Sequence, residues 1–170
     1  ASVLLLEAED RPGYHATGRS AAFWTESYGG PQIQPLTTAS GEFLRQNGFL
    51  SPRRALTIGR AGQERRIEAF AARFAGLGVA IELLGASRIA EFVPGLRDGW
   101  TLGALEPECS DIDVAALHQH YLRTAAKAST ALWCRAGLAA ASRCSGGWHL
   151  ALADGREAEC AVLVNAAGAW

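Results

Sequence analysis

The chain has 170 residues, of which 49% are hydrophobic and 19% are charged, and its 16 basic and 17 acidic side chains leave a net charge of −1. A chain of this length and composition buries a sizeable core and is globular. The balanced charge argues against a nucleic-acid partner, and the apolar runs are far shorter than the roughly 20 residues that span a bilayer.

The N-terminal part begins with a predicted strand. Residues 2–7 form an unbroken run of mostly branched apolar side chains that ends on an acid, a pattern typical of a strand buried on both faces in a parallel sheet. A loop over 8–18 follows, and the residues from Ser20 onward predict a short helix. A second helix is predicted over 31–47, with a kink or a later start at Pro35.

The middle part mixes both kinds of element. Strands are predicted over 55–59, 79–84 and 100–105. Between them, apolar residues recur at helical spacing over 67–77 and 87–92. Asp113 is a natural N-cap for a further helix over 114–127.

The last part reads as a meander of strands over 131–135, 137–141, 148–152 and 157–165. Asp154-Gly155 supplies the turn before the final strand. We interpret this meander as an insertion into, or a flank of, a nucleotide-binding sheet.

Cysteine and histidine spacing predicts no metal site. His118 and His120 are two apart in a helical pattern, so they point to different faces. The four cysteines are far apart and lack a C-x-x-C pair, which favours free thiols in a reducing cytoplasm; they are Cys109, Cys134, Cys144 and Cys160. The sequence contains no methionine, so we expect it to be a piece of a longer chain.

Glu7 is the first candidate binding residue. In a dinucleotide-binding fold, the carboxylate at the end of the second strand accepts hydrogen bonds from the adenosine ribose. The glycine-rich turn that belongs about 20 residues earlier would then precede Ala1. The alternative is an ordinary surface strand that ends on a glutamate.

The stretch GYHATGRSAA after this strand is rich in small donors. Thr17, Gly18, Arg19 and Ser20 offer backbone N–H groups, hydroxyls and a guanidinium near a predicted helix N-terminus, which suits phosphate oxygens. The alternative is an N-capped surface helix.

Several motifs in order resemble one known family. VLLLEAEDRPGYHATGRSAA is similar to the start of the FAD-dependent D-amino acid oxidase-like (DAO) family, and closest to its D-arginine dehydrogenase-like members. SYGGPQIQPLTTAS, LSPR, DIDVAALHQHYLR and VLVNAAGAW follow in family order, so the resemblance covers most of the chain.

The resemblance implies an α/β fold with FAD as cofactor. An incomplete Rossmann-like FAD-binding domain would comprise residues 1–50 and 108–170, and 51–107 would be an inserted α+β portion of the substrate domain. The residues implied to contact FAD are Glu7, Ala8, His15, Thr17, Gly18, Arg19, Ser20, Ala21, Ala22, Leu138, Ala167 and Gly168. Some related dehydrogenases attach FAD covalently through a similarly placed histidine, and a non-covalent role for His15 is the favoured alternative.

The resemblance also implies a substrate pocket formed by Phe23, Tyr28 and Ala55. Tyr28 corresponds to a tyrosine near the substrate, whereas Phe23 stands where a histidine is common. Members that take basic amino acids have a carboxylate near Ala55, and its absence from this loop argues against an arginine-like substrate. Core packing is the alternative for Phe23 and Trp24.

The implied reaction is oxidation of an amino acid or related amine by hydride transfer from its α-carbon to FAD, giving an imino acid and then a 2-oxo acid and ammonia. A 2-hydroxy acid dehydrogenase and a non-catalytic flavin-binding subunit are the alternatives, while the GYHATGRSAA loop disfavours an NAD-binding domain. We expect the 170-residue piece alone to be inactive and to bind FAD poorly. The electron acceptor and the oligomeric state are left open.

Overall fold

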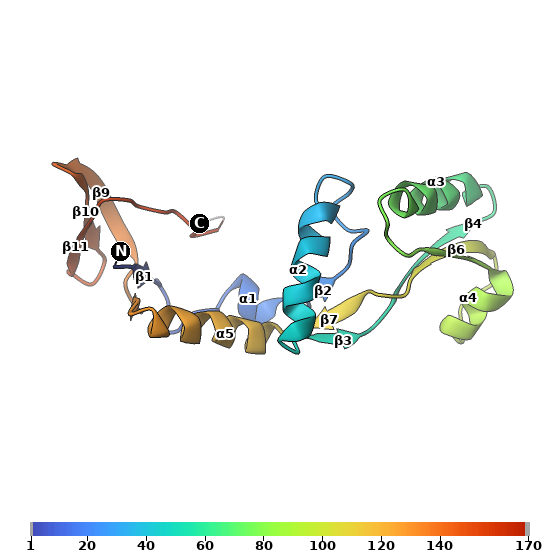
Figure 1. The fold of residues 1–170 in the computed structure, drawn as a ribbon, viewed down its shortest axis with the longest axis horizontal. Coiled ribbons are helices and arrows are strands. Elements are labelled where there is room, and N and C mark those ends of the chain that lie inside the picture. The colour runs from blue at the N-terminus through green and yellow to red at the C-terminus, as the bar shows by residue number, and fades with distance from the viewer. Residues whose placement is uncertain (1, 169–170) are drawn as a thin grey trace. The chain divides into compact units, whose positions relative to one another are not determined.

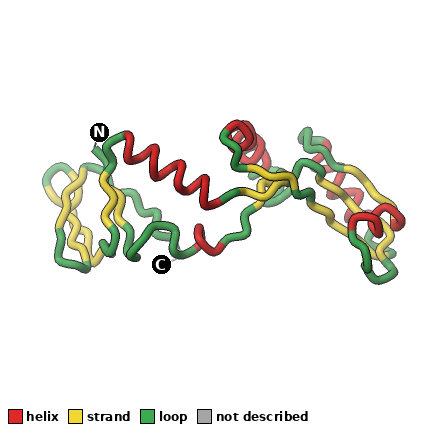
Figure 2. The backbone as a smooth tube through the Cα atoms, turned by 90° about the horizontal axis from the view of Figure 1, so that it is seen from below, coloured by secondary structure: helices red, strands yellow, loops and turns green. Residues whose placement is uncertain are grey.

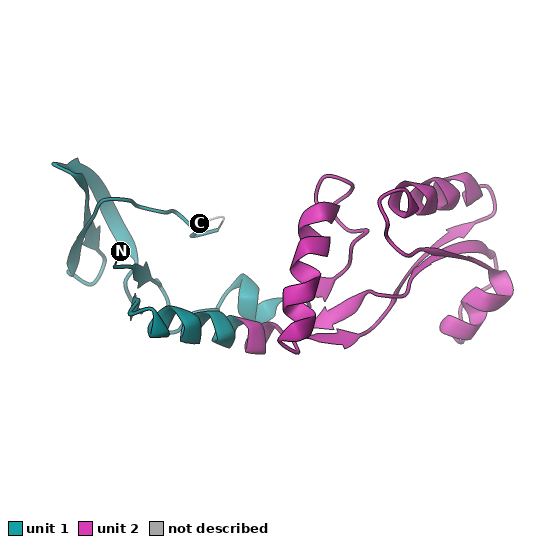
Figure 3. Cartoon of the chain, viewed as in Figure 1, with its two compact units in different colours: residues 1–20, 118–170 teal, residues 21–117 magenta. Residues whose placement is uncertain are grey.

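The computed structural model describes residues 2–168, which form two compact units (Figure 3). One unit combines residues 1–20 with 118–170, and the other is the continuous stretch 21–117. The division falls inside helix α5 (Val114–Lys127). Residues 21–50 and 108–117 pack in the same compact unit as 51–107. Their assignment to the FAD-binding domain stays a prediction.

The discontinuous unit is mainly β-structure (Figure 1). Its elements, apart from α5, are β1 (Leu4–Leu6), α1 (Ala16–Arg19), β8 (Ala131–Trp133), β9 (Leu138–Cys144), β10 (Gly147–Leu152) and β11 (Glu157–Cys160). β1 pairs in parallel with β8, and β9, β10 and β11 form an antiparallel sheet in the order β11-β10-β9. The core of this unit is formed by Ala136, Leu150 and Leu152.

β1 has the predicted parallel pairing but is not buried on both faces. Leu5 is 38% exposed, and β8 is the one strand that pairs with β1 among the described residues. The apolar run therefore predicted the partner type correctly and the burial wrongly.

The continuous unit contains two small antiparallel sheets and three helices. Its elements are β2 (Phe23–Trp24), α2 (Gln34–Gln46), β3 (Leu50–Pro52), β4 (Ala55–Arg60), α3 (Glu64–Ala75), β5 (Glu82–Gly85), α4 (Ala86–Phe92), β6 (Trp100–Glu106) and β7 (Ser110–Ile112). The strand orders are β2-β7-β3 and β4-β6-β5. Trp24, Leu44 and Phe49 form one core cluster, and Ile89 is completely buried in another.

Several predicted elements differ from the structure: β5 begins at Glu82 instead of residue 79, and β8 ends at Trp133 instead of residue 135. The helix expected from Ser20 is absent: the one-turn helix α1 ends at Arg19, and Ser20 is its extended C-cap. The backbone then enters β2, where the Ile112 N–H donates to the Ala22 carbonyl at 2.9 Å. Pairing with β7 therefore outweighs local helix propensity.

The last predicted strand is also shorter than expected. Cys160 pairs with Trp148 at the start of β10, so 161–165 extend beyond that neighbour and have no strand partner within the described part of the chain (Figure 2). Over residues 2–168, no helix is both long and apolar enough to cross a bilayer.

Candidate functional site

Glu7 directly follows β1 and is fixed by the neighbouring strand. Its N–H donates to the Trp133 carbonyl at 2.9 Å, and its own carbonyl accepts from the Ala136 N–H at 2.8 Å. Oε1 of the Glu7 carboxylate accepts from the Glu9 N–H at 2.9 Å, while Oε2 makes no hydrogen bond to a described residue. One oxygen of a well-positioned carboxylate is thus available to a ligand hydroxyl.

Gly13 and Gly18 bring the following segment into a tight turn. Gly13 has φ of +78°, in the left-handed region that favours glycine. A Cβ on Gly18 would lie 2.3 Å from the Gly13 carbonyl oxygen, a separation that no side chain tolerates. The turn therefore needs both glycines for its own backbone, whatever it binds.

His118 on α5 packs against this turn. A Cβ added to Gly13 would lie 2.9 Å from Cε1 of the His118 ring, so the imidazole covers the bare face of Gly13. The spacing of His118 and His120 disfavours a metal site and does not predict this contact with Gly13. Gly13 and His118 are far apart in the chain, so no local sequence pattern predicts their contact.

Several polar side chains of residues 9–19 already contact one another. The guanidinium groups of Arg11 and Arg19 lie 5.6 Å and 5.1 Å from the centroid of the Tyr14 ring. Nε of Arg19 also donates to the Tyr14 carbonyl at 3.3 Å. His15 Nε2 and Glu9 Oε1 are 2.7 Å apart, so the imidazole pairs with a carboxylate. Such pairing orients the ring at an exposed position.

The remaining candidate cofactor residues are spread over the chain. A Cβ at Gly137 would lie 3.7 Å from the Cβ of Ala8, so the start of β9 with its 49%-exposed Leu138 is close to the residue after Glu7. Ala21 and Ala22 lie in the continuous unit. Ala167 donates its N–H to Asn165 Oδ1 at 3.0 Å, and the neighbouring Gly168 has a φ of +78°.

The predicted substrate residues lie in the continuous unit. Phe23 on β2 is 42% exposed and has the Arg53 guanidinium 4.2 Å from its ring centroid. Tyr28, in the segment between β2 and α2, is 78% exposed. Trp24, the next residue of β2, faces the opposite side of the strand. It is 3% exposed and its indole N–H donates to the Thr37 carbonyl at 2.8 Å, so it belongs to the core.

The structure places a carboxylate opposite Ala55 that the sequence reasoning missed. Ala55 pairs across the sheet with Glu106, which is only 2% exposed. Both Glu106 oxygens accept hydrogen bonds from residues 25–27, so the group is not open to a substrate cation. Burial and the Glu106 charge together raise the pKa of the Cys109 thiol. Strand register brings Glu106 to Ala55, and loop composition does not reveal register.

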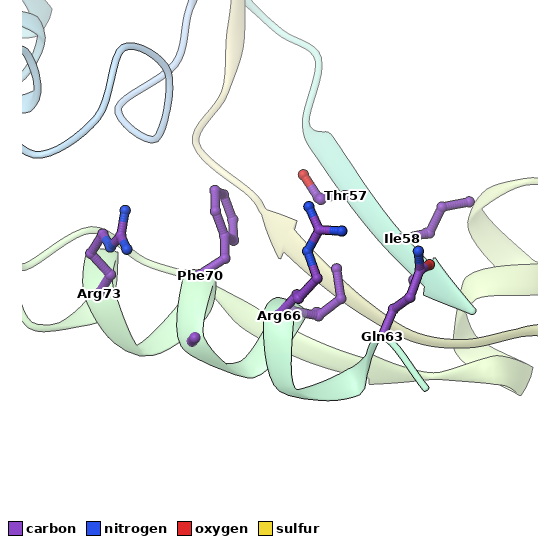
Figure 4. A pocket seen from close by; sticks show the side chains of 9 residues that line it. Thr57, Ile58, Gln63, Arg66, Phe70 and Arg73 are labelled. Carbon is purple, nitrogen blue, oxygen red and sulfur yellow. The ribbon is translucent and has the colours of Figure 1, made fainter. Parts of the chain in front are cut away.

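A separate groove of about 510 Å³ lies between α3 and β4 (Figure 4). Arg66, Phe70 and Arg73 project into it from α3, and Thr57 lines its β4 side. None of the sequence-predicted site residues lines this groove.

The residues of the glycine turn fit the nucleotide end of FAD. Glu7 offers a free carboxylate oxygen, as a ribose diol requires, and the exposed hydroxyls of Thr17 and Ser20 make no hydrogen bond within residues 2–168. Arg19 adds a positive charge that suits a pyrophosphate. Among the described residues, no three His, Cys, Asp or Glu side chains cluster to hold a metal ion.

The whole sequence also matches a known family. The sequence profile of the DAO family, described as FAD dependent oxidoreductase, matches residues 1–170.

Solved structures share the fold at low sequence identity. Glycine oxidase from Geobacillus kaustophilus matches with a TM-score of 0.82 and 18% identity, over 99% of this chain and 49% of its own. L-proline dehydrogenase from P. horikoshii gives 0.83 and 15%, over 99% and 47%. L-alpha-glycerophosphate oxidase from Mycoplasma pneumoniae, solved with FAD bound, gives 0.76 and 12%, over 89% and 43%. This chain therefore spans less than half the length of each.

Proposed function

Because this chain belongs to the FAD dependent oxidoreductase family (DAO), we propose that the protein carrying it oxidises an amino acid or a related amine. FAD supplies the acceptor for the hydride that leaves the substrate α-carbon. The resulting imino acid hydrolyses to a 2-oxo acid and ammonia. The observations that carry the proposal are the free carboxylate oxygen of Glu7 and the glycine turn over residues 13–18, in a chain whose whole length fits the family.

We propose that the discontinuous unit holds the nucleotide end of FAD. The free Glu7 oxygen accepts hydrogen bonds from the ribose, and the Thr17 and Ser20 hydroxyls donate to phosphate oxygens. Arg19 contributes a charge, while His15 orients itself against Glu9. Ala8, Gly18, Leu138, Ala167 and Gly168 lack bulky polar groups and act as small or apolar walls.

Phe23 and Tyr28 are the proposed substrate contacts. Their exposure supports this role, since neither side chain is used to fill the core. The Glu106 carboxylate opposite Ala55 is not free to bind a cation, because both of its oxygens accept hydrogen bonds from residues 25–27. We therefore propose a substrate without a distal cation, which agrees with the small amino acids named for glycine oxidase and L-proline dehydrogenase.

Flavin bleaching in the intact protein tests this function. The FAD-loaded protein is mixed without oxygen with a panel of amino acids and matched 2-hydroxy acids, and the loss of oxidised-flavin absorbance is followed. We expect bleaching by at least one amino acid with a small or apolar side chain, with release of ammonia in proportion where that amino acid is a primary amine. Bleaching by hydroxy acids alone would contradict the proposal.

A hydroxyl-bearing substrate is the second candidate. The shared fold with L-alpha-glycerophosphate oxidase, whose name indicates an alcohol substrate, favours it. The same panel separates the two by the class of compound that bleaches the flavin, and ammonia is released only when a primary amine is oxidised. A protein that binds FAD but is bleached by neither class would be a non-catalytic flavin-binding subunit.

We also propose a cytoplasmic location. The four cysteines are all free, and the exposed Cys144 would be prone to oxidation outside a reducing compartment. Fractionation of cells that express the intact protein tests this.

A further inference from the structure

Glu106, at the end of β6, is a buried carboxylate with three hydrogen-bond donors. Its Oε2 accepts from the Thr25 hydroxyl at 2.9 Å and from the Ser27 hydroxyl at 2.5 Å. Its Oε1 accepts from the Glu26 N–H at 2.6 Å. With 2% exposure, this charge depends on those donors, because a buried carboxylate without partners is costly.

All three donors come from consecutive residues at the start of the segment between β2 and α2. Glu26 makes a second hydrogen bond besides that of its N–H to Glu106, because its side chain accepts from the Thr38 hydroxyl on α2. Gln34 Nε2 in turn donates to that hydroxyl at 2.7 Å, and Gln34 is only 6% exposed. The start of the segment is thus fixed from β6 and from α2.

The end of the same segment is fixed as well. The Gly30 carbonyl accepts from the Ile33 and Gln34 N–H groups, both at 3.1 Å. Tyr28 lies between these two anchors, directly after Ser27, and its side chain is 78% exposed. A side chain held out of the core on a short stretch that is anchored at both ends occupies a restricted region of space.

We propose that Glu106 is a positioning residue: by binding Thr25, Glu26 and Ser27 it fixes the backbone that presents Tyr28. The role of Glu106 in substrate binding rests on the proposed function of Tyr28. The hydrogen bonds by which Glu106 holds residues 25–27, here called the tether, do not depend on that function, since they are contacts within residues 25–38 and Glu106.

The test compares Glu106→Gln with Glu108→Gln in the intact, FAD-loaded protein. Glutamine keeps one carbonyl oxygen but replaces the other acceptor with a donor, so either the Thr25 and Ser27 hydroxyls or the Glu26 N–H lose their acceptor. Glu108 is an exposed residue two positions along, and Glu108→Gln makes the same chemical change without that contact. Where Glu106→Gln fails to fold, Ser27→Ala takes its place and removes one donor.

Kinetics in two backgrounds separate positioning from general stability. We expect Glu106→Gln to raise the KM for the bleaching amino acid by roughly tenfold, the size of losing a hydrogen bond to a charged group, with kcat changed less. In a Tyr28→Ala background the same substitution should leave KM nearly unchanged, because its target is gone. An equal increase in both backgrounds, or none in either, would overturn the proposal.

Hydrogen exchange gives a readout that needs no activity. Amides of 25–28 should exchange faster in Glu106→Gln than in Glu108→Gln, and amides of α3 should not differ. Unchanged exchange over 25–28 would refute the tether. If the wild-type protein is bleached by no amino acid, the proposed function fails, and this exchange measurement still decides whether Glu106 holds the segment.

Discussion

Gly13 and Gly18 show how single residues shape the proposed cofactor turn. The resemblance to the DAO family implies that Gly18 contacts FAD. In the structure, the first requirement is internal, because a Cβ on Gly18 would collide with the Gly13 carbonyl and His118 covers Gly13. The sequence shows that this segment contains glycines. It does not show why they are needed, because the reason is the close approach of Gly18 to the Gly13 carbonyl and of His118 on α5 to Gly13.

Gly18→Ala should distort the turn and weaken FAD binding. The added methyl would lie 2.3 Å from a backbone oxygen that cannot rotate away, so the segment must shift. We expect at least a tenfold rise in the FAD dissociation constant, on the order of 1.4 kcal/mol, measured by flavin fluorescence. Gly85→Ala is the control, since a Cβ there meets nothing within 4 Å, and near-wild-type affinity is expected for it.

Asp154 should make stability depend on pH in the acid range. Hydrogen bonds from the Arg156 side chain and N–H lower the pKa of Asp154, so the folded state favours the ionised form. The stabilisation is fully present above the unfolded pKa of about 3.9 and is lost as pH falls through the lower folded value.

Carboxyl titration by NMR in the wild type and in Arg156→Gln measures this effect. The substitution should move the Asp154 pKa up toward its ordinary value and flatten the acid limb of the stability curve. An unchanged Asp154 pKa would show that the Arg156 side chain is not its cause.

Helix α5 is an element that the sequence predicted closely. The expected bounds and the Asp113 cap both hold, and Asp113 Oδ1 accepts from the Ala116 N–H at 2.8 Å. Caps and periodicity are local signals, so they can be read without the fold. In contrast, β2, β3 and β7 are two or three residues long and exist through pairing with one another, which local composition does not encode.

Asp113→Ala should cost about 1 kcal/mol of unfolding free energy through loss of this cap. Asp113→Asn retains a side-chain oxygen and should cost markedly less. Chemical denaturation of the intact protein gives both values, and equal losses for the two variants would argue for a charge effect instead of a cap.

At the scale of the whole molecule, family membership confirms the predicted resemblance and the FAD cofactor. The α/β fold is shared with solved structures of which this chain spans less than half. Motif order along the chain carried this identification. The assignment of residues 21–50 and 108–117 to a domain remains a prediction, because sequence position does not report which core a segment packs into.

FAD should stabilise the intact protein through mass action. A ligand at about 100 times its dissociation constant adds roughly 2.7 kcal/mol of unfolding free energy. Glu7→Gln, which weakens the ribose acceptor, should lower that gain by about 1.4 kcal/mol if affinity falls tenfold. Thermal unfolding at fixed FAD measures it, and Glu159→Gln, an exposed glutamate on β11, serves as the control. An equal gain in all three proteins would remove Glu7 from the cofactor site.

The parallel pairing of β1 with β8 has a consequence for the order of events during translation. The stretch 21–117 is continuous, so it can collapse as soon as it leaves the ribosome. Leu4–Leu6 must wait, unpaired and apolar, until Ala131–Trp133 has been synthesised. Until then, this apolar segment lacks the β8 partner that it has in the folded protein.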